Sequence, residues 1–355
     1  MKAHPPTTRP AGTAQPPPES RRVRAAWTLA LLTTLCAELT FTAVAVPSTW
    51  LLLPLLLVMY GAGVLLIREA VVRFGGGLPS LVALGLAYQL AEDGLGLQAL
   101  NSPDMYDAAD WGLRALGINW TYWESQIGIH VVLSVVLPVM IADLIFPHLR
   151  ERPYLRTGGL TATGSLALLG VLGLRFFISA TEDPGYRTPT GWTLTYLAGI
   201  ALMVWLALRV LPRRRRRPGA RRDRKAPHPF VVGFVSLYLT MAFLTTLLPL
   251  GLEGDLLLGD TMSKPFLLVV AAMTAIPFAW LAARWGTAGN WSDVHRLWLA
   301  GGILVSHTAF MMPGSLTSFL VGLATTGLEV LALRALARHL RQPHAAPAPA
   351  PGRTW

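Results

Sequence analysis

Long apolar runs alternate with short polar segments along almost the whole chain. Each run is close to the roughly 20 residues that an α-helix needs to cross the hydrocarbon core of a bilayer. The pattern therefore predicts an all-α fold, a polytopic integral membrane bundle of about ten transmembrane helices. The ten runs are residues 25–46, 49–70, 78–99, 126–147, 159–180, 191–212, 229–251, 264–284, 297–313 and 315–337.

The two ends of the chain have a different composition. Residues 1–24 and 341–355 are rich in proline and polar side chains. Such segments bury too little apolar surface to offset the entropy of ordering, so both are expected to be disordered tails. The transmembrane domain is then residues 25–340. The first run is longer than the roughly 7–15 apolar residues of a signal peptide, which favours a retained span.

Composition supports a membrane protein and excludes two kinds of site. Hydrophobic residues make up 53% of the chain and charged residues 14%, against about 25% charged in soluble domains. The single cysteine, Cys36, rules out an internal disulfide and a cysteine-based zinc site. Three lysines against 27 arginines indicate GC-rich codons and a bacterial source.

The arginines at the ends of the runs predict an orientation. If all ten runs span, arginines gather on one side, whereas the opposite loops are acidic or nearly neutral. Positive loops stay in the cytoplasm, so both termini are expected there, in a plasma membrane. The cytoplasmic Arg-rich loop 213–228 holds nine Arg or Lys and one Asp between Arg213 and Lys225. We expect this loop to contact anionic lipids of the inner leaflet and not nucleic acid.

Several ionisable side chains fall inside the runs. Each costs about 2.5–3.5 kcal/mol at the centre of a bilayer, so such groups usually face the bundle interior and are candidates for function. Six of them share a depth in the outer half of their runs, and we expect them to form a substrate or proton/cation pocket. They are Glu38, Glu92, Asp93, His130, Arg175 and His307.

A structural alternative exists for these residues. Glu92 or Asp93 would pair with Arg175 as a structural ion pair, or extend to the outer membrane interface, without further function. Two other acids, Glu69 and Asp143, lie close to the arginine-rich side and are expected to form surface pairs there with Arg68, Arg73 or Arg150.

The predicted external loop 100–125 combines acidic and aromatic residues. Its aromatic side chains suit the membrane–water boundary, so they are expected to form an interfacial anchor or a lid over the pocket, with an amphipathic helix at 106–118. These side chains are Tyr106, Trp111, Trp120, Tyr122 and Trp123.

Three resemblances to known families bear on function. Asp104, Asp107 and Asp110 are similar to an aspartate motif of UbiA-type prenyltransferases, which implies magnesium and diphosphate binding, although the spacing differs. Glu92-Asp93 with His130 and His307 resembles the CAAX-processing intramembrane glutamic proteases, but the arginine of that motif is missing. Ten spans with both ends inside resemble the drug/metabolite transporters in span count.

The favoured function is a secondary transporter or permease for a small solute, with an outward-facing pocket of acids and histidines. An intramembrane hydrolase or transferase acting on a lipid or membrane-embedded substrate is the first alternative, and a non-catalytic assembly partner is the second. No G-x-x-x-x-G-K-[ST], G-x-G-x-x-G or H-E-x-x-H motif occurs. No cofactor and no metal are therefore expected, and whether the protein is an enzyme stays open.

Overall fold

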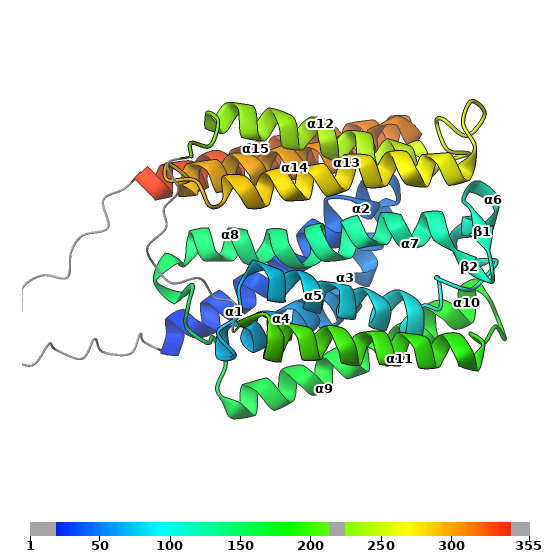
Figure 1. Ribbon diagram of the computed structural model, residues 1–355, viewed down its shortest axis with the longest axis horizontal. Coiled ribbons are helices and arrows are strands. Elements are labelled where there is room, and N and C mark those ends of the chain that lie inside the picture. Colours follow the sequence, from blue (N-terminus) through cyan, green and yellow to red (C-terminus); the bar gives the residue numbers. More distant parts are fainter. Residues whose placement is uncertain (1–18, 213–223, 342–355) are drawn as a thin grey trace, which may run out of the picture.

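A computed structural model describes residues 19–212 and 224–341 as a helical bundle (Figure 1). Most of both predicted tails and most of the segment from Arg213 to Lys225 lie outside the described residues.

The predicted runs form helical segments, several of which combine α-helical, π-helical and 3-10 turns. The first five runs contain α1 (Glu19–Thr34), η1 (Leu35–Leu39) and α2 (Thr42–Ala45); η2 (Pro47–Leu52), α3 (Leu53–Leu56), η3 (Leu57–Gly61) and α4 (Ala62–Arg73); α5 (Leu78–Gln89) and η4 (Leu90–Gly96); α7 (Trp120–Gln126), η6 (Ile127–Val136) and α8 (Leu137–Ile145); and α9 (Thr157–Gly173), η8 (Leu174–Ser179) and α10 (Ala180–Glu182). The last five runs contain α11 (Thr190–Trp205) and η9 (Leu206–Val210); α12 (Pro229–Leu247); α13 (Lys264–Trp285); α14 (Asp293–Phe310) and η12 (Met312–Gly314); and α15 (Leu316–Arg341).

Eight helices in the described part of the chain are long and apolar enough to cross a membrane. The all-α membrane bundle is thus confirmed. The other two predicted runs, 25–46 and 78–99, are also helical but do not meet this measure. The first is interrupted at Thr40 and Phe41, and the second carries Glu92 and Asp93 in its last turns.

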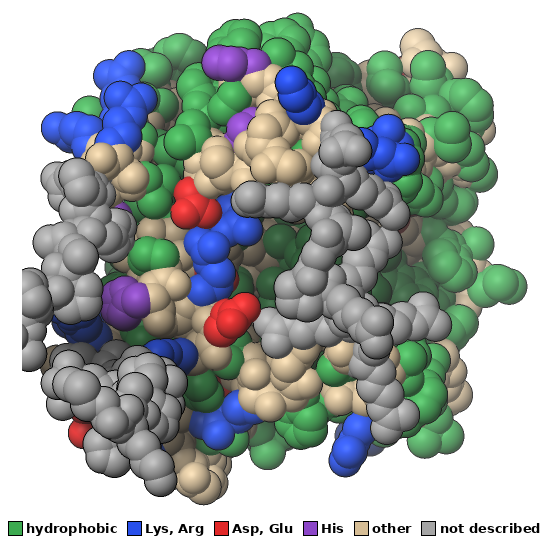
Figure 2. All heavy atoms as spheres, turned by 60° about the vertical axis from the view of Figure 1, so that its left-hand side comes forward, with side chains coloured by type: hydrophobic (Ala, Val, Ile, Leu, Met, Phe, Trp, Pro, Cys, Tyr) green, Lys and Arg blue, Asp and Glu red, His purple; other side chains and the backbone are tan. Residues whose placement is uncertain are grey.

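The described ends of the chain lie at the same end of the bundle. In Figure 1, the start of α1 and the end of α15 are both on the left, whereas α6, β1 and β2 are on the right. We call the first the terminal end and the second the loop end. Seen from the terminal end, Figure 2 shows several Arg and Lys side chains, with Asp and Glu among them. This arrangement agrees with an even number of crossings.

One helix occupies the middle of the bundle. In Figure 1, α7 and α8 run between a layer of α12 to α15 and a layer that includes α4, α5, α9 and α11. In the span Trp120–Ile145, 67% of the apolar 18-residue stretch is buried inside the protein. The corresponding share is 11% for Thr190–Val210 and for Lys264–Trp285. The outer helices instead expose large apolar side chains such as Phe176 and Met273. Apolar surface on this scale is suited to lipid contact.

Ion pairs hold the terminal end together, as predicted for Glu69 and Asp143. Glu69 lies 3.5 Å from the guanidinium of Arg68 and 3.3 Å from that of Arg73. Asp143 lies 3.9 Å from the guanidinium groups of both Arg68 and Arg150. The pairing of these two acids with arginines is confirmed, but Arg68 and Glu69 are buried, so the expected surface location is wrong for Glu69.

Two predicted boundaries are wrong. Helix α1 begins at Glu19, so residues 19–24 are helical and not part of a disordered tail. Arg22 stabilises this extension because its guanidinium donates hydrogen bonds to the carbonyl oxygens of Tyr154 and Leu155. The fourth run begins at Trp120 and not at residue 126, so α7 takes the last part of the predicted loop 100–125.

The predicted amphipathic helix at 106–118 is also wrong. Tyr106 and Asp107 have left-handed φ angles of 57° and 51°, which end helical geometry. The segment forms η5 (Met105–Asp107), α6 (Ala108–Trp111) and a hairpin of β1 (Arg114–Ala115) with β2 (Ile118–Asn119).

Small residues let α12 and α14 pack closely. A Cβ atom added at Gly302 would collide with the carbonyl oxygen of Gly233 and the hydroxyl of Ser236. Close approach of backbones at glycine and serine is a usual way for membrane helices to associate, because van der Waals contact replaces the hydrophobic effect there.

Gly302→Ala should therefore lower the stability of the protein in detergent by about 1–3 kcal/mol, the usual cost of overpacking. Gly327→Ala is the matched control, because a Cβ atom at Gly327 meets no atom within 4 Å. Thermal or denaturant unfolding followed by circular dichroism measures both. Equal stability of the two variants would show that α12 and α14 do not pack as described.

Candidate functional site

Four of the six predicted pocket residues lie together inside the bundle. Glu38 lies on η1, Glu92 and Asp93 lie on η4, and His130 lies on η6. The Nδ1 atom of His130 is 3.3 Å from Oε2 of Glu92. Its Nε2 atom is 3.3 Å from Oδ2 of Asp93. The imidazole thus lies between two carboxyl groups, and all three side chains are buried.

Tyr60 connects Glu38 to this trio. Its hydroxyl donates a hydrogen bond of 2.6 Å to Oε1 of Glu38. Its ring stacks on His130, with 6.1 Å between ring centroids and 19° between the planes. Through Tyr60, the first run therefore contributes its carboxyl group to the same polar centre.

Tyr88 approaches His130 from another side. The two rings meet edge to face with 6.1 Å between centroids. The ring of Tyr88 fits because Gly63 has no side chain, and an added Cβ there would lie 2.6 Å from the ring. We call the group Glu38, Tyr60, Tyr88, Glu92, Asp93, Tyr122 and His130 the acid–histidine cluster.

Tyr122 belongs to this cluster and not to a lid. Its hydroxyl donates a hydrogen bond of 3.1 Å to Oδ1 of Asp93, and its side chain is buried. Trp123 exchanges hydrogen bonds with Gln89, the residue one turn before Asp93. Trp120 stacks on Trp123 at 5.5 Å. The aromatic start of this helix therefore packs around the cluster.

Tyr106 and Trp111 stay at the loop end of the bundle. The indole of Trp111 donates a hydrogen bond to the carbonyl oxygen of Tyr106. The ring of Tyr106 stacks on Tyr122 at 6.0 Å and is 45% exposed. Tyr106 and Trp111, and Trp120 through the exposed hydrogen bond of its indole to the carbonyl oxygen of Ala115 in β1, are placed where a lid or interfacial anchor would be.

Sequence reasoning did not assign Tyr60 to the pocket. A phenol inside an apolar run is itself a signal, since a buried tyrosine hydroxyl usually finds a hydrogen-bond partner. Tyr88 lies four residues before Glu92 in the sequence, a spacing that puts the two side chains on one face of a helix.

Several buried polar atoms of the cluster make no hydrogen bond with the described residues. They are both Oε atoms of Glu92, Oδ2 of Asp93, Nδ1 of His130 and the hydroxyl of Tyr88. No ion pair links an arginine or lysine among residues 19–212 and 224–341 to Glu38, Glu92 or Asp93. A buried polar group left unsatisfied costs about 1–3 kcal/mol, and more if charged. Because Nδ1 of His130 faces Oε2 of Glu92, and Nε2 faces Oδ2 of Asp93, at 3.3 Å, the cluster combines ion-pair contacts with hydrogen-bonding capacity that its own members leave unused.

The cluster lies on irregular helical backbone. The described chain has six π-helical segments, and four of them carry Glu38, Tyr60, Glu92–Asp93 and His130. A π-turn breaks the regular i to i−4 hydrogen-bond ladder, and such turns are frequent at functional sites. Four interrupted helices that meet at one polar centre point to a site.

His307 lies at a different place, beside the interruption of the first run. Its Nδ1 atom is 2.7 Å from the carbonyl oxygen of Leu304. Its Nε2 atom is 3.2 Å from both the carbonyl oxygen of Cys36 and the hydroxyl of Thr40. The ring also stacks on Phe41. These contacts satisfy backbone groups where the helix stops, so His307 supports the segment that carries Glu38.

Arg175 does not join the cluster. It lines a pocket of about 510 Å³ at the loop end, together with Gln98, Tyr186 and Arg187. Among the described residues no ion pair links Arg175 to Glu92 or Asp93. The structural ion pair considered as an alternative is thus not formed in this structure.

No group of three or more His, Cys, Asp or Glu among the described residues could hold a metal ion. Asp104, Asp107 and Asp110 are among these residues, and all three are exposed in or near α6.

The chain belongs to a family described as "Uncharacterized membrane protein family", whose model matches residues 28–341. No curated protein and no solved structure matches the chain significantly. The family and the eight candidate spans together establish a helical multi-pass membrane protein.

If His130 and Glu92 interact as described, their substitutions should not be additive. We expect a double-mutant cycle of His130→Gln and Glu92→Gln to give a coupling free energy of about 1–3 kcal/mol. The measurement is denaturant unfolding of the four proteins in detergent.

The control cycle pairs His130→Gln with Asp260→Asn. Asp260 is exposed in the loop between α12 and α13, so these two changes should add within about 0.5 kcal/mol. A coupling near zero in both cycles would mean that the imidazole and the carboxyl of Glu92 are not partners.

Proposed function

We propose that this protein is a proton-coupled secondary transporter for a small solute, with the acid–histidine cluster as its proton site. The observation that supports this most is the imidazole of His130 between the carboxyl groups of Glu92 and Asp93, each 3.3 Å away and buried. Ionisable groups inside membrane helices, without arginine partners, are typical of proton relays in pumps and transporters.

Proton binding at such a cluster changes the energy of burying it. The net charge of Glu92, Asp93 and His130 changes by one each time the group gains or loses a proton. A net charge is costly in a low-dielectric interior. Each proton therefore shifts the balance between arrangements that exclude water from the cluster and arrangements that admit it. The interrupted helices that carry Glu38, Glu92 and His130 are suited to such a change, as in other transporters with broken helices.

The pocket that contains Arg175 supports a class of solute. Gln98 lines this pocket and follows Glu92 by only six residues. Arg175 and Arg187 both contribute cationic groups to it, and its one acidic residue, Asp183, accepts a hydrogen bond from the hydroxyl of Ser102. Guanidinium groups bind carboxylates in a bidentate manner, so we propose a small organic anion as the solute and this pocket as its external entrance.

The orientation follows from the arginine distribution. We propose that the terminal end faces the cytoplasm and that the protein resides in a bacterial plasma membrane, as the positive-inside rule predicts. The loop end, with the pocket of Arg175, is then external. We also propose that the basic segment from Arg213 to Lys225, most of which lies outside the described residues, contacts anionic lipids of the inner leaflet.

A membrane-embedded hydrolase is the second candidate. The adjacent acids Glu92 and Asp93 with His130 are the groups that general-base activation of water requires. Glu92→Gln would inactivate both a hydrolase and a transporter. The wild-type protein separates the two, because only a hydrolase would convert its substrate into a product in the absence of any proton gradient. A third candidate, an assembly partner, would tolerate the change.

Glu92→Gln should abolish proton-coupled flux. The wild-type protein, reconstituted in vesicles with a trapped pH-sensitive dye, should acidify the vesicle interior when small carboxylates are added outside. A side-chain amide in place of the Glu92 carboxyl cannot bind and release a proton, so flux should fall at least about 100-fold, whereas Asp260→Asn should keep the wild-type rate.

Two results would count against transport. One is wild-type flux in Glu92→Gln, Asp93→Asn and His130→Gln alike. The other is the appearance of a chemically altered solute, which would favour the hydrolase. Solute counterflow without a pH gradient separates lost proton coupling from lost solute binding.

A further inference from the structure

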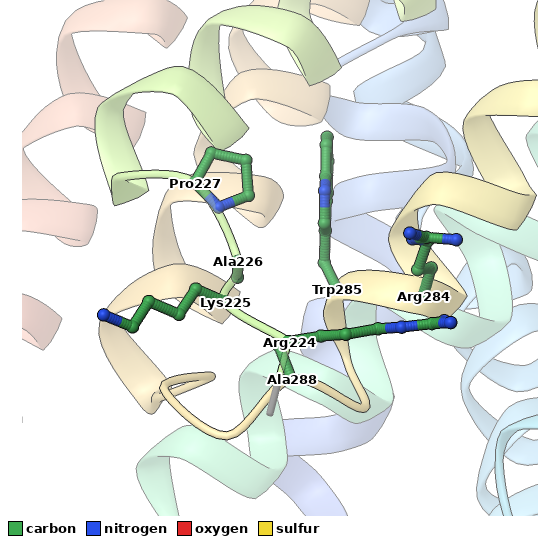
Figure 3. A pocket seen from close by; sticks show the side chains of 7 residues that line it. All are labelled: Arg224, Lys225, Ala226, Pro227, Arg284, Trp285 and Ala288. Carbon is green, nitrogen blue, oxygen red and sulfur yellow. The ribbon is translucent and has the colours of Figure 1, made fainter. Parts of the chain in front are cut away.

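We infer that the terminal end of the bundle carries a built binding site for the phosphate group of an anionic phospholipid. The site is a pocket of about 370 Å³ between the start of α12 and the end of α13, shown in Figure 3. Its lining includes Arg224, Lys225, Arg284 and Trp285. This inference does not depend on what the acid–histidine cluster does.

The backbone of the pocket is held in place from several sides. The side chain of Asn290 accepts a hydrogen bond from the backbone N–H of Ala226 and donates one to its carbonyl oxygen. The backbone N–H of Gly289 donates to the carbonyl oxygen of Arg224. The Nε2 atom of His295 lies 3.1 Å from the carbonyl oxygen of Pro227. These bonds fix residues 224–227 against the turn after α13, so the pocket is preorganised.

The charge of the pocket is strongly positive. Two arginines and one lysine line it, and no acidic residue is part of the lining. In Figure 3 the side chains of Arg224 and Arg284 extend to the same side of the Trp285 ring, whereas Lys225 extends to the other side. Within the described residues, Arg224, Lys225 and Arg284 form no ion pair with an acid. A phosphate accepts bidentate hydrogen bonds from such groups.

The position of the pocket favours a lipid over a soluble phosphate. Trp280 lies one turn before Arg284, contacts its guanidinium at 5.1 Å and is 58% exposed. Phe230, in the first turn of α12, is 56% exposed. Exposed aromatic rings beside basic groups mark the headgroup level of a bilayer. A phospholipid would place its phosphate in the pocket and its chains along these apolar helix faces.

The test is native mass spectrometry of the full chain in a non-ionic detergent, titrated with phosphatidylglycerol and, separately, with phosphatidylcholine of the same acyl chains. We expect tighter binding of phosphatidylglycerol. Arg224→Gln and Arg284→Gln should each weaken it about fivefold, as removal of one basic group near a headgroup does. Arg338→Gln is the control, because Arg338 is exposed in the last turn of α15, and the variant loses the same charge.

An unchanged affinity in Arg338→Gln, together with the loss in the pocket variants, supports the site. Equally weakened binding of phosphatidylglycerol in all three variants would mean that only the net charge of the protein matters, and would overturn the proposed site. Equal affinity for the two lipids would overturn it as well. Soluble glycerol phosphate is the last arm: if it binds as tightly as phosphatidylglycerol, the phosphate chemistry stands, but the lipid assignment is wrong. Thermal unfolding confirms that each variant is folded.

Discussion

The imidazole of His130 and the carboxyl groups of Glu92 and Asp93 contact one another in a bundle whose outer surface is suited to lipid. Inside a membrane, polar groups must find partners within the protein, so this contact constrains everything around it. Two helical segments, η4 and η6, have to bring these side chains to one depth. Tyr60 and Tyr122 supply hydrogen bonds to Glu38 and Asp93, and aromatic rings close the space around the imidazole.

The rest of the structure can be understood as support for this centre. The most buried span, Trp120–Ile145, carries His130, whereas the outer spans are mainly apolar surface. At the terminal end, ion pairs of Arg68 with Glu69 and Asp143 hold the helices together. Firm packing there and at Gly302 contrasts with the π-helical segments around the cluster. Under the proposed transport function, movement would be concentrated in those interrupted segments, since rigid helices pivot about irregular backbone.

The apolar runs predicted the helices well, because a 20-residue apolar segment has few alternatives in a bilayer. Two groupings were also predicted from the side of the membrane and the depth at which each residue lies along its run. They are the pairing of Glu69 and Asp143 with arginines and the meeting of Glu38, Glu92, Asp93 and His130. Depth does not specify the angle around the bundle axis, however, and this is why Arg175 and His307 lie elsewhere. Left-handed backbone at Tyr106 and Asp107, and the early start of α7 at Trp120, depend on tertiary contacts that no periodicity reveals.

Infrared difference spectroscopy tests most directly whether the cluster exchanges protons. The reconstituted protein is exposed to alternating buffers of two pH values, and the carbonyl stretch of protonated carboxyl groups is recorded. The proposal predicts a band in wild type and in Asp260→Asn that is lost or shifted in Glu92→Gln and disturbed in His130→Gln. Identical spectra for all four proteins would contradict it, because the buried carboxyl of Glu92 would then neither gain nor release a proton.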